Sequence, residues 1–150
     1  MLKTVYGDLL QAKETIIAHQ VNCFGDAGGL AYHIFRRWPD AGNDYRQVVS
    51  RLARNGKQIA LLGMAQLTGP QPDGKIIANL YGQYFPGRDF RPLMLERALT
   101  ALASAAKAMN ASVAIPYGIS CGICGGDWRL VRRIIEETMK DVDVTIYHLV

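Results

Sequence analysis

The chain has 150 residues, of which 49% are hydrophobic and 20% charged, and this balance predicts one globular domain over residues 1–150 rather than a disordered chain. No segment approaches the roughly 20 consecutive apolar residues that span a bilayer, and the first residues lack the apolar run of a signal peptide, so we expect a soluble, cytoplasmic protein without membrane contact, and a monomer. The net charge of +4 suits an anionic ligand, but the basic residues are spread over several segments, which leaves nucleic acid as an open but less favoured partner.

The first part of the chain predicts two strands followed by two helices. Residues 2–6 and 15–21 are short runs rich in β-branched and apolar residues, which predict strands. The second run is apolar almost throughout, which is typical of a strand covered on both faces. Apolar residues then recur at helical spacing up to Pro39, and Asp40 is expected to cap a second helix that ends at Asn55-Gly56.

The rest of the chain continues the alternation of strands and helices. Four further strands are predicted, at residues 59–64, 76–81, 113–115 and 144–149. Residues 93–109 predict the longest helix, and Asp127 is expected to cap a last helix over residues 128–140. The order of elements predicts a three-layer α/β/α sandwich around a mixed, mostly parallel, six-stranded sheet.

Two glycine-rich segments each follow a buried strand and precede a helix. They are Gly25-Asp26-Ala27-Gly28-Gly29 and residues 120–126. Ligands of open α/β sheets bind at the carboxyl ends of strands, and the free N–H groups at a helix start attract phosphate. Either segment alone is equally consistent with a tight turn, but the two together favour a cleft that binds an anion. Neither segment has the pattern of a P-loop or of a dinucleotide-binding loop, so those two functions lose their main support.

Four segments, taken in order, resemble the signature segments of macrodomains. They are Gly7-Asp8-Leu9-Leu10, Ile17-Ala18-His19-Gln20-Val21-Asn22, Ala27-Gly28-Gly29-Leu30-Ala31-Tyr32 and Ser120-Cys121-Gly122-Ile123-Cys124-Gly125. The chain is similar above all to the small macrodomains that include ADP-ribose phosphate phosphatases and a subfamily that removes ADP-ribose from acidic side chains. The resemblance implies that the partner is ADP-ribose or an ADP-ribosylated protein and that no cofactor is needed.

The resemblance also implies a role for each part of the binding site. Asp8 and the amide of Leu9 would recognise the adenine, and Tyr147 would stack on it. Asn22 would hold the distal ribose, which Gly28, Gly29 and Leu30 would wrap. The diphosphate would rest on the backbone of six residues, namely Ser120, Cys121, Gly122, Ile123, Cys124 and Gly125. An ordinary turn aspartate, a strand-end asparagine and a core tyrosine remain the alternatives for Asp8, Asn22 and Tyr147.

Several departures from the family pattern bear on catalysis. His19 stands where hydrolytic members often carry asparagine, and Ala27 stands where they often carry glycine. Cys124 occupies the place of the aspartate that the subfamily acting on acidic side chains pairs with a lysine, and residues 78–83 contain no lysine. His19 and Asp26 remain as candidates, because an imidazole transfers protons near neutral pH and a carboxylate can orient a water. A core role for His19 is equally consistent with the sequence.

The sequence therefore leaves three classes of function. We expect ADP-ribose binding, with hydrolysis of a distal-ribose ester or phosphate by His19 or Asp26 as the associated activity. The competing class is a non-catalytic reader of ADP-ribosylated partners, or of another nucleotide diphosphate. The least favoured class is a redox module built on Cys121-Gly122-Ile123-Cys124, or an RNA-binding module. No spacing typical of metal ligands is present.

Overall fold

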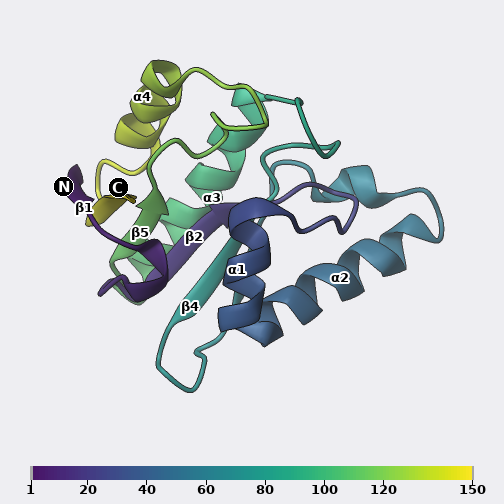
Figure 1. Ribbon diagram of the computed structural model, residues 1–150, viewed down its shortest axis with the longest axis horizontal. Helices are drawn as coiled ribbons and strands as arrows, with labels where there is room; N and C mark the ends of the chain where they lie inside the picture. The colour runs from purple at the N-terminus through teal and green to yellow at the C-terminus, as the bar shows by residue number, and fades with distance from the viewer. Residues whose placement is uncertain (1, 150) are drawn as a thin grey trace.

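Six strands form a single sheet in the computed structural model, which describes residues 2–149 (Figure 1). The strands are β1 (Leu2–Tyr6), β2 (Ile16–Gln20), β3 (Ala65–Thr68), β4 (Ile76–Leu80), β5 (Val113–Pro116) and β6 (Val144–His148). Their order across the sheet is β1-β6-β5-β2-β4-β3, with β3 antiparallel to β4 and every other neighbouring pair parallel. This confirms the mixed, mostly parallel sheet. Residues 1 and 150 of the predicted domain lie outside the described residues.

Helices cover both faces of this sheet. They are α1 (Gly29–Arg37), α2 (Pro39–Ala53), α3 (Pro92–Met109) and α4 (Trp128–Thr138), with two short 3-10 helices, η1 (Leu9–Gln11) and η2 (Gln58–Leu61). Ile16 and Ala18 of β2 pack in one core with α3 and α4, whereas Ile17 packs in a second core with α1 and α2. Successive side chains of a strand point to opposite faces, so β2 is covered on both sides. Figure 1 shows the strands between the two pairs of helices, which confirms the three-layer sandwich.

Two helices begin at or next to the predicted residues. The Asp127 carboxylate accepts a hydrogen bond from the Arg129 amide at 3.0 Å and caps α4 as expected. Pro92 lies in the first turn of α3, and the helix ends at Asn110, whose φ of 50° is left-handed. None of the helices within residues 2–149 combines the length and the apolar character needed to cross a bilayer.

The strand predicted at residues 59–64 is wrong. Residues 58–61 form η2, and the strand begins only at Ala65, at the edge of the sheet. Leu61 is buried in the core beside α2, whereas Ile59 is 57% exposed. A short apolar run has no periodicity that separates a strand from a single turn, so packing against α2 decided its conformation.

The predicted cap of the second helix is also wrong. Helix α2 begins at Pro39, and its N-cap residue is Trp38, which makes no side-chain capping hydrogen bond. Trp38 is buried and donates from Nε1 to the carboxylate of Asp73 at 2.9 Å. The fixed φ of proline suits the first position of a helix, so α2 begins at Pro39, directly after the buried Trp38. Asp40 therefore lies inside the first turn and not at the N-cap.

Candidate functional site

Three loops leave the same edge of the sheet side by side. Loop 21–28 follows β2, loop 81–91 follows β4 and loop 117–127 follows β5, and these three strands are adjacent and parallel in the sheet. The carboxyl ends of parallel strands meet at one edge, which is where open α/β sheets bind ligands. The three loops therefore converge, although they are far apart in the sequence.

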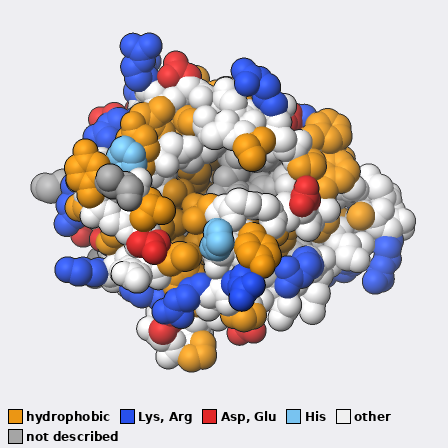
Figure 2. Space-filling model, in the orientation of Figure 1, with side chains coloured by type: hydrophobic (Ala, Val, Ile, Leu, Met, Phe, Trp, Pro, Cys, Tyr) orange, Lys and Arg blue, Asp and Glu red, His pale blue; other side chains and the backbone are white. Residues whose placement is uncertain are grey.

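A cleft of about 420 Å³ opens between these loops, and this volume lies within the range of small-molecule sites. Figure 2 shows the hollow near the middle of this face, with a rim that is mostly uncharged. Asp26 is the one carboxylate among the residues that line the cleft, and no lysine or arginine is among them. The lining residues are His19, Gln20, Val21, Asn22, Asp26, Gly28, Gly29, Leu30, Ala31, Gln83, Pro86, Gly87, Pro116, Tyr117, Gly118, Ile119, Ser120, Gly122, Ile123 and Cys124.

Loop 21–28 is held by the side chain of Asn22. This buried amide donates to the carbonyl of Asp26 at 2.8 Å, and its oxygen accepts from the amide of Phe24 at 2.8 Å. The hydroxyl of Tyr45 on α2 lies 2.8 Å from the Asn22 carbonyl and 3.1 Å from the amide of Gly25. The loop is therefore ordered by Asn22 from within and by Tyr45 from α2. It leads into α1, whose N-cap Gly28 makes no side-chain hydrogen bond, so the first N–H groups of that helix are open to a ligand.

Loop 117–127 folds back on itself through its backbone. The amide of Gly125 donates to Gly122 and that of Gly126 donates to Ser120, at 3.1 and 2.8 Å. The N–H groups of Ser120, Gly122, Ile123 and Cys124 donate to no other residue in the described part of the chain, and all four residues line the cleft. Successive free N–H groups in a concave loop form an anion-binding surface.

Two glycines on the cleft are required neither by a steric contact nor by a left-handed backbone. Gly28 has an extended backbone with a φ of −103°, and Gly122 is not among the glycines with positive φ. A Cβ atom at either position would meet no protein atom within 4 Å. By contrast, a Cβ on Gly126 would lie 2.6 Å from the carbonyl oxygen of Ser120. A ligand that approaches the backbone closely is a physical reason for glycine at positions 28 and 122.

No family model matches the chain. It is 30% identical to a macrodomain protein of Streptomyces coelicolor, whose solved structure superposes with a TM-score of 0.80 and 98% coverage of each chain. The chain belongs to the macrodomain family. The macrodomain of Mycobacterium tuberculosis DarG is 27% identical, with a TM-score of 0.83 and coverage of 98% of this chain and 97% of that one. The ADP-ribose 1''-phosphate phosphatase of Saccharomyces cerevisiae (strain YJM789) is 27% identical over 97% of both chains.

The cleft of this macrodomain brings together most of the residues predicted for its site. Ten of them line it, namely His19, Asn22, Asp26, Gly28, Gly29, Leu30, Ser120, Gly122, Ile123 and Cys124. Cys121 and Gly125 belong to the same loop but do not line the cleft. Asp8, Leu9 and Tyr147 also lie outside it.

The three residues outside the cleft have local partners. Asp8 caps η1 by accepting from the Leu10 amide at 2.9 Å, and Leu9 is buried under that turn. The Tyr147 hydroxyl donates to the carboxylate of Glu14 at 2.6 Å. These contacts are those of a turn aspartate and a half-buried tyrosine, and the adenine role of the three residues remains a prediction.

The two candidate catalytic side chains differ in their access to the cleft. The imidazole of His19 is 1% exposed, its Nε2 lies 2.7 Å from Oδ1 of Asn79, and its Nδ1 is buried without a partner among the described residues. Burial lowers the pKa of His19 to about 4, against the hydrogen bond with Asn79, so the ring is neutral near pH 7. Asp26 is exposed on loop 21–28. Its carboxylate is thus the accessible one of the two groups.

Sequence reasoning missed Tyr45, Tyr117, Gln20 and Gln83. Tyr45 stands among the apolar positions of α2, where its hydroxyl gave the only sign, because a buried tyrosine needs a partner for that group. Tyr117 lines the cleft directly after Pro116, and its ring is parallel to that of His148 at a centroid distance of 3.9 Å. Its place in a glycine-rich loop was the available signal. Nothing in the local sequence marks the two glutamines, because their partners are distant in the chain.

The three thiols lie close to the site but are not activated. Burial raises the pKa of Cys23 to about 12 and that of Cys121 to about 11, and burial also raises the pKa of Cys124. A reactive cysteine needs a lowered pKa, so the redox class loses its support. Within residues 2–149, no group of three or more His, Cys, Asp or Glu side chains could hold a metal ion.

Proposed function

We propose that this macrodomain binds ADP-ribose, with the diphosphate on the free N–H groups of loop 117–127 and the distal ribose against loop 21–28 and the start of α1. The convergence of these two stretches on one cleft carries the proposal. The absence of lysine and arginine among the lining residues supports an anion site made of backbone dipoles rather than of side-chain cations. The similarity to the yeast ADP-ribose 1''-phosphate phosphatase supports this choice of ligand.

We further propose that a bond at the distal ribose, an ester or a phosphate, is the one hydrolysed. Asp26 would orient the attacking water and accept its proton, because it is exposed on the loop proposed to hold that ribose. His19 would support this loop from below, since both of its ring nitrogens are buried and its Nε2 is bound to Asn79. A direct proton transfer by His19 is the alternative, and the same experiment separates the two roles.

Titration calorimetry with ADP-ribose tests the binding proposal. Affinity in the micromolar range or tighter is expected, with adenosine monophosphate as the control that lacks the distal ribose. No detectable heat of binding would overturn the proposal.

Turnover separates an enzyme from a reader. Release of phosphate from ADP-ribose 1''-phosphate and of ADP-ribose from modified protein would be measured for the natural sequence, Asp26→Asn and His19→Gln. Loss of a positioned general base costs roughly 100-fold or more in kcat, so Asp26→Asn should lose that much while its affinity for ADP-ribose changes little. A larger loss of kcat in His19→Gln would assign the base to His19, and unchanged rates in both variants would remove both roles.

The second candidate function is a non-catalytic reader of ADP-ribosylated partners. The observation that favours it is the scarcity of ionisable groups in the cleft, where Asp26 is the one carboxylate and His19 is held neutral. Tight binding without turnover of either substrate is the result expected for a reader.

A further inference from the structure

Three side chains form a continuous chain of hydrogen bonds between two of the loops that line the cleft. The hydroxyl of Ser120 on loop 117–127 bonds to Oε1 of Gln20 at the end of β2. Nε2 of Gln20 donates to Oε1 of Gln83 on loop 81–91 at 2.8 Å. Nε2 of Gln83 then donates to the carbonyls of Phe85 and Gly87, at 2.7 and 3.1 Å. We call the chain Ser120–Gln20–Gln83 the amide relay.

The contacts of Gln83 determine which atom donates and which accepts in every hydrogen bond of the amide relay. Two carbonyl groups face one atom of the Gln83 amide, so that atom must be the nitrogen, which is a donor. The oxygen of Gln83 therefore accepts from Gln20, and the oxygen of Gln20 must accept the proton of Ser120. Because that proton is used, Ser120 can accept from a ligand but cannot donate to its phosphate.

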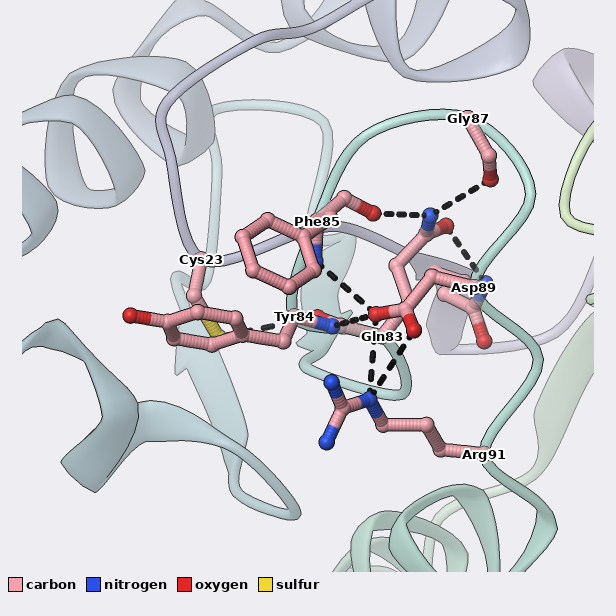
Figure 3. A network of polar contacts seen from close by, with 8 residues as sticks. Cys23, Gln83, Tyr84, Phe85, Gly87, Asp89 and Arg91 are labelled. Atoms are coloured by element: carbon pink, nitrogen blue, oxygen red, sulfur yellow. Dashed lines mark hydrogen bonds and ion pairs between the residues drawn. The ribbon is translucent and has the colours of Figure 1, made fainter.

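Loop 81–91 forms one wall of the cleft and is cross-linked by its own polar contacts, which Figure 3 shows. The Asp89 carboxylate accepts from the amides of Tyr84 and Phe85, both at 2.9 Å, and from Nε of Arg91 at 3.0 Å. Burial opposes ionisation of Asp89, but these hydrogen bonds prevail and lower its pKa. The guanidinium of Arg91 also lies over the ring of Tyr84. The wall thus behaves as one unit.

The wall also meets the other two loops directly. The ring of Phe85 stacks on that of Phe24 on loop 21–28, with centroids 5.4 Å apart. On the other side, a Cβ on Gly125 would lie 3.0 Å from Cγ of Arg88, so Arg88 packs against loop 117–127. Oε1 of Gln20 lies against Gly82, where a Cβ would overlap it, so the place of Gln20 depends on the glycine at that position. The separation between loops 81–91 and 117–127 is thus set through Gln20.

We propose that Gln20 and Gln83 are positioning residues that hold loop 117–127 and the wall at the spacing that ADP-ribose requires. This inference rests on the proposed function. It means that Gln20 and Gln83 hold the cleft in its binding shape before the ligand arrives. A preformed cleft binds more tightly because no ordering cost is left at the moment of binding. The side chains of Gln20 and Gln83 are only part-buried, so water can replace their lost partners and the fold itself depends little on them.

The decisive variant is Gln20→Glu, which keeps the shape of the side chain and removes its donor. At about pH 7.5 the introduced carboxylate would face the oxygen of Gln83, and turning that amide over would place its oxygen against two carbonyls. Affinity for ADP-ribose by calorimetry should fall about tenfold relative to the natural sequence, a loss of the size expected for one broken polar contact. At about pH 5 part of the carboxyl population is protonated and can again donate to Gln83, so the loss of affinity relative to the natural sequence should become measurably smaller.

A pH-dependent rescue separates a polar role of Gln20 from a purely structural one. The uncharged cycle of Gln20→Met and Gln83→Met separates the relay from direct repulsion of the diphosphate by the introduced carboxylate, because Gln20 lines the cleft. A loss of affinity that stays constant between the two pH values, or no loss at all, would overturn the proposal. Gln47→Met on the exposed face of α2 is the control for changing a glutamine far from the cleft, and it should bind as the natural sequence does. If the natural sequence itself fails to bind ADP-ribose, the proposed function fails rather than the relay.

A double-mutant cycle covers the case in which Gln20→Glu does not fold. Gln20→Met and Gln83→Met should each weaken binding about tenfold, and the double variant should weaken it by about the same factor, because residues that act as one unit are not additive. A double variant that is about 100-fold weaker would show that the two side chains act independently, which contradicts the relay. Ser120→Gly breaks the relay from its other end, at a residue whose φ of 67° already suits glycine, and unchanged affinity in this variant would also contradict it.

Discussion

The Nε2 atom of His19 lies 2.7 Å from Oδ1 of Asn79, and this pair joins β2 to β4 inside the core beneath α1. Nδ2 of Asn79 donates to the carbonyl of Ala41 and to Oε1 of Gln66, both at 3.2 Å, so Oδ1 is the acceptor that faces the imidazole. The proton of the neutral ring is therefore on Nε2, and the buried Nδ1 is an acceptor without a donor among the described residues. A second proton on this ring would be buried and unpaired.

This geometry predicts a loss of stability in mild acid. The pKa of His19 is about 4 in the folded protein and near 6.5 in the unfolded chain, so the unfolded state takes up the proton first as the pH falls. The contribution is complete above about pH 6.5 and is lost progressively down to about pH 4, which amounts to about 2 kcal/mol between about pH 7 and pH 4.5. Urea unfolding of the natural sequence and of His19→Gln at these two pH values measures it. An equal pH dependence in both proteins would contradict the assignment.

Tyr45 is expected to matter for both stability and binding. Its buried hydroxyl bonds to the carbonyl and side-chain oxygens of Asn22 and accepts from the amide of Gly25, so Tyr45→Phe leaves the Asn22 carbonyl and the Gly25 amide without this partner. The free energy of unfolding should fall by about 1–3 kcal/mol, and affinity for ADP-ribose should fall with it because loop 21–28 loses its anchor. Denaturant titration and calorimetry measure the two effects. Tyr6→Phe, at a residue that is 77% exposed, is the control that should change neither.

Two glycines of loop 117–127 should respond oppositely to alanine. Gly126→Ala places a Cβ 2.6 Å from the carbonyl oxygen of Ser120 and should lower the free energy of unfolding by about 1–3 kcal/mol. Gly122→Ala meets no protein atom within 4 Å, so its thermal midpoint should stay close to that of the natural sequence while its affinity for ADP-ribose falls about tenfold. Unchanged affinity in Gly122→Ala would mean that the backbone at this position does not contact the ligand.

The thiols should be unreactive in the folded protein. With pKa values of about 12 for Cys23 and about 11 for Cys121, the thiolate fraction near neutral pH is far below that of a free cysteine. Alkylation by iodoacetamide should be at least about tenfold slower than in the urea-unfolded chain. Rapid alkylation of the native protein at Cys121 or Cys124 would restore the redox interpretation.

A related variant tests whether Cys124 contributes its side chain or only its backbone to the cleft. Cys124→Ser keeps the N–H group that we propose to face the diphosphate, so calorimetry should give an affinity for ADP-ribose within about twofold of that of the natural sequence. A loss of about tenfold or more would assign the thiol itself to the ligand.

The spacing of apolar residues and the helix-capping residues in the sequence were sufficient to predict the three layers of this fold. The nearly continuous apolar run of β2 predicted a strand covered on both faces, and Asp127 predicted the start of α4, because both signals depend on neighbours within a few residues. The same local logic failed at residues 59–64, where packing of Leu61 against α2 outweighed the strand preference of a short apolar run.

The sequence by itself determined the class of fold, the two glycine-rich loops and the resemblance that names ADP-ribose as the ligand to test. Only the tertiary structure decided that these loops share one cleft with loop 81–91, that the His19 ring is closed off in the core, and that Gln20 contacts Ser120, which lies 100 positions further along the chain. Propensity and spacing report on contacts along a helix turn or a strand. The order of parallel strands in the sheet brings distant loops together, and that order follows from how the two cores pack.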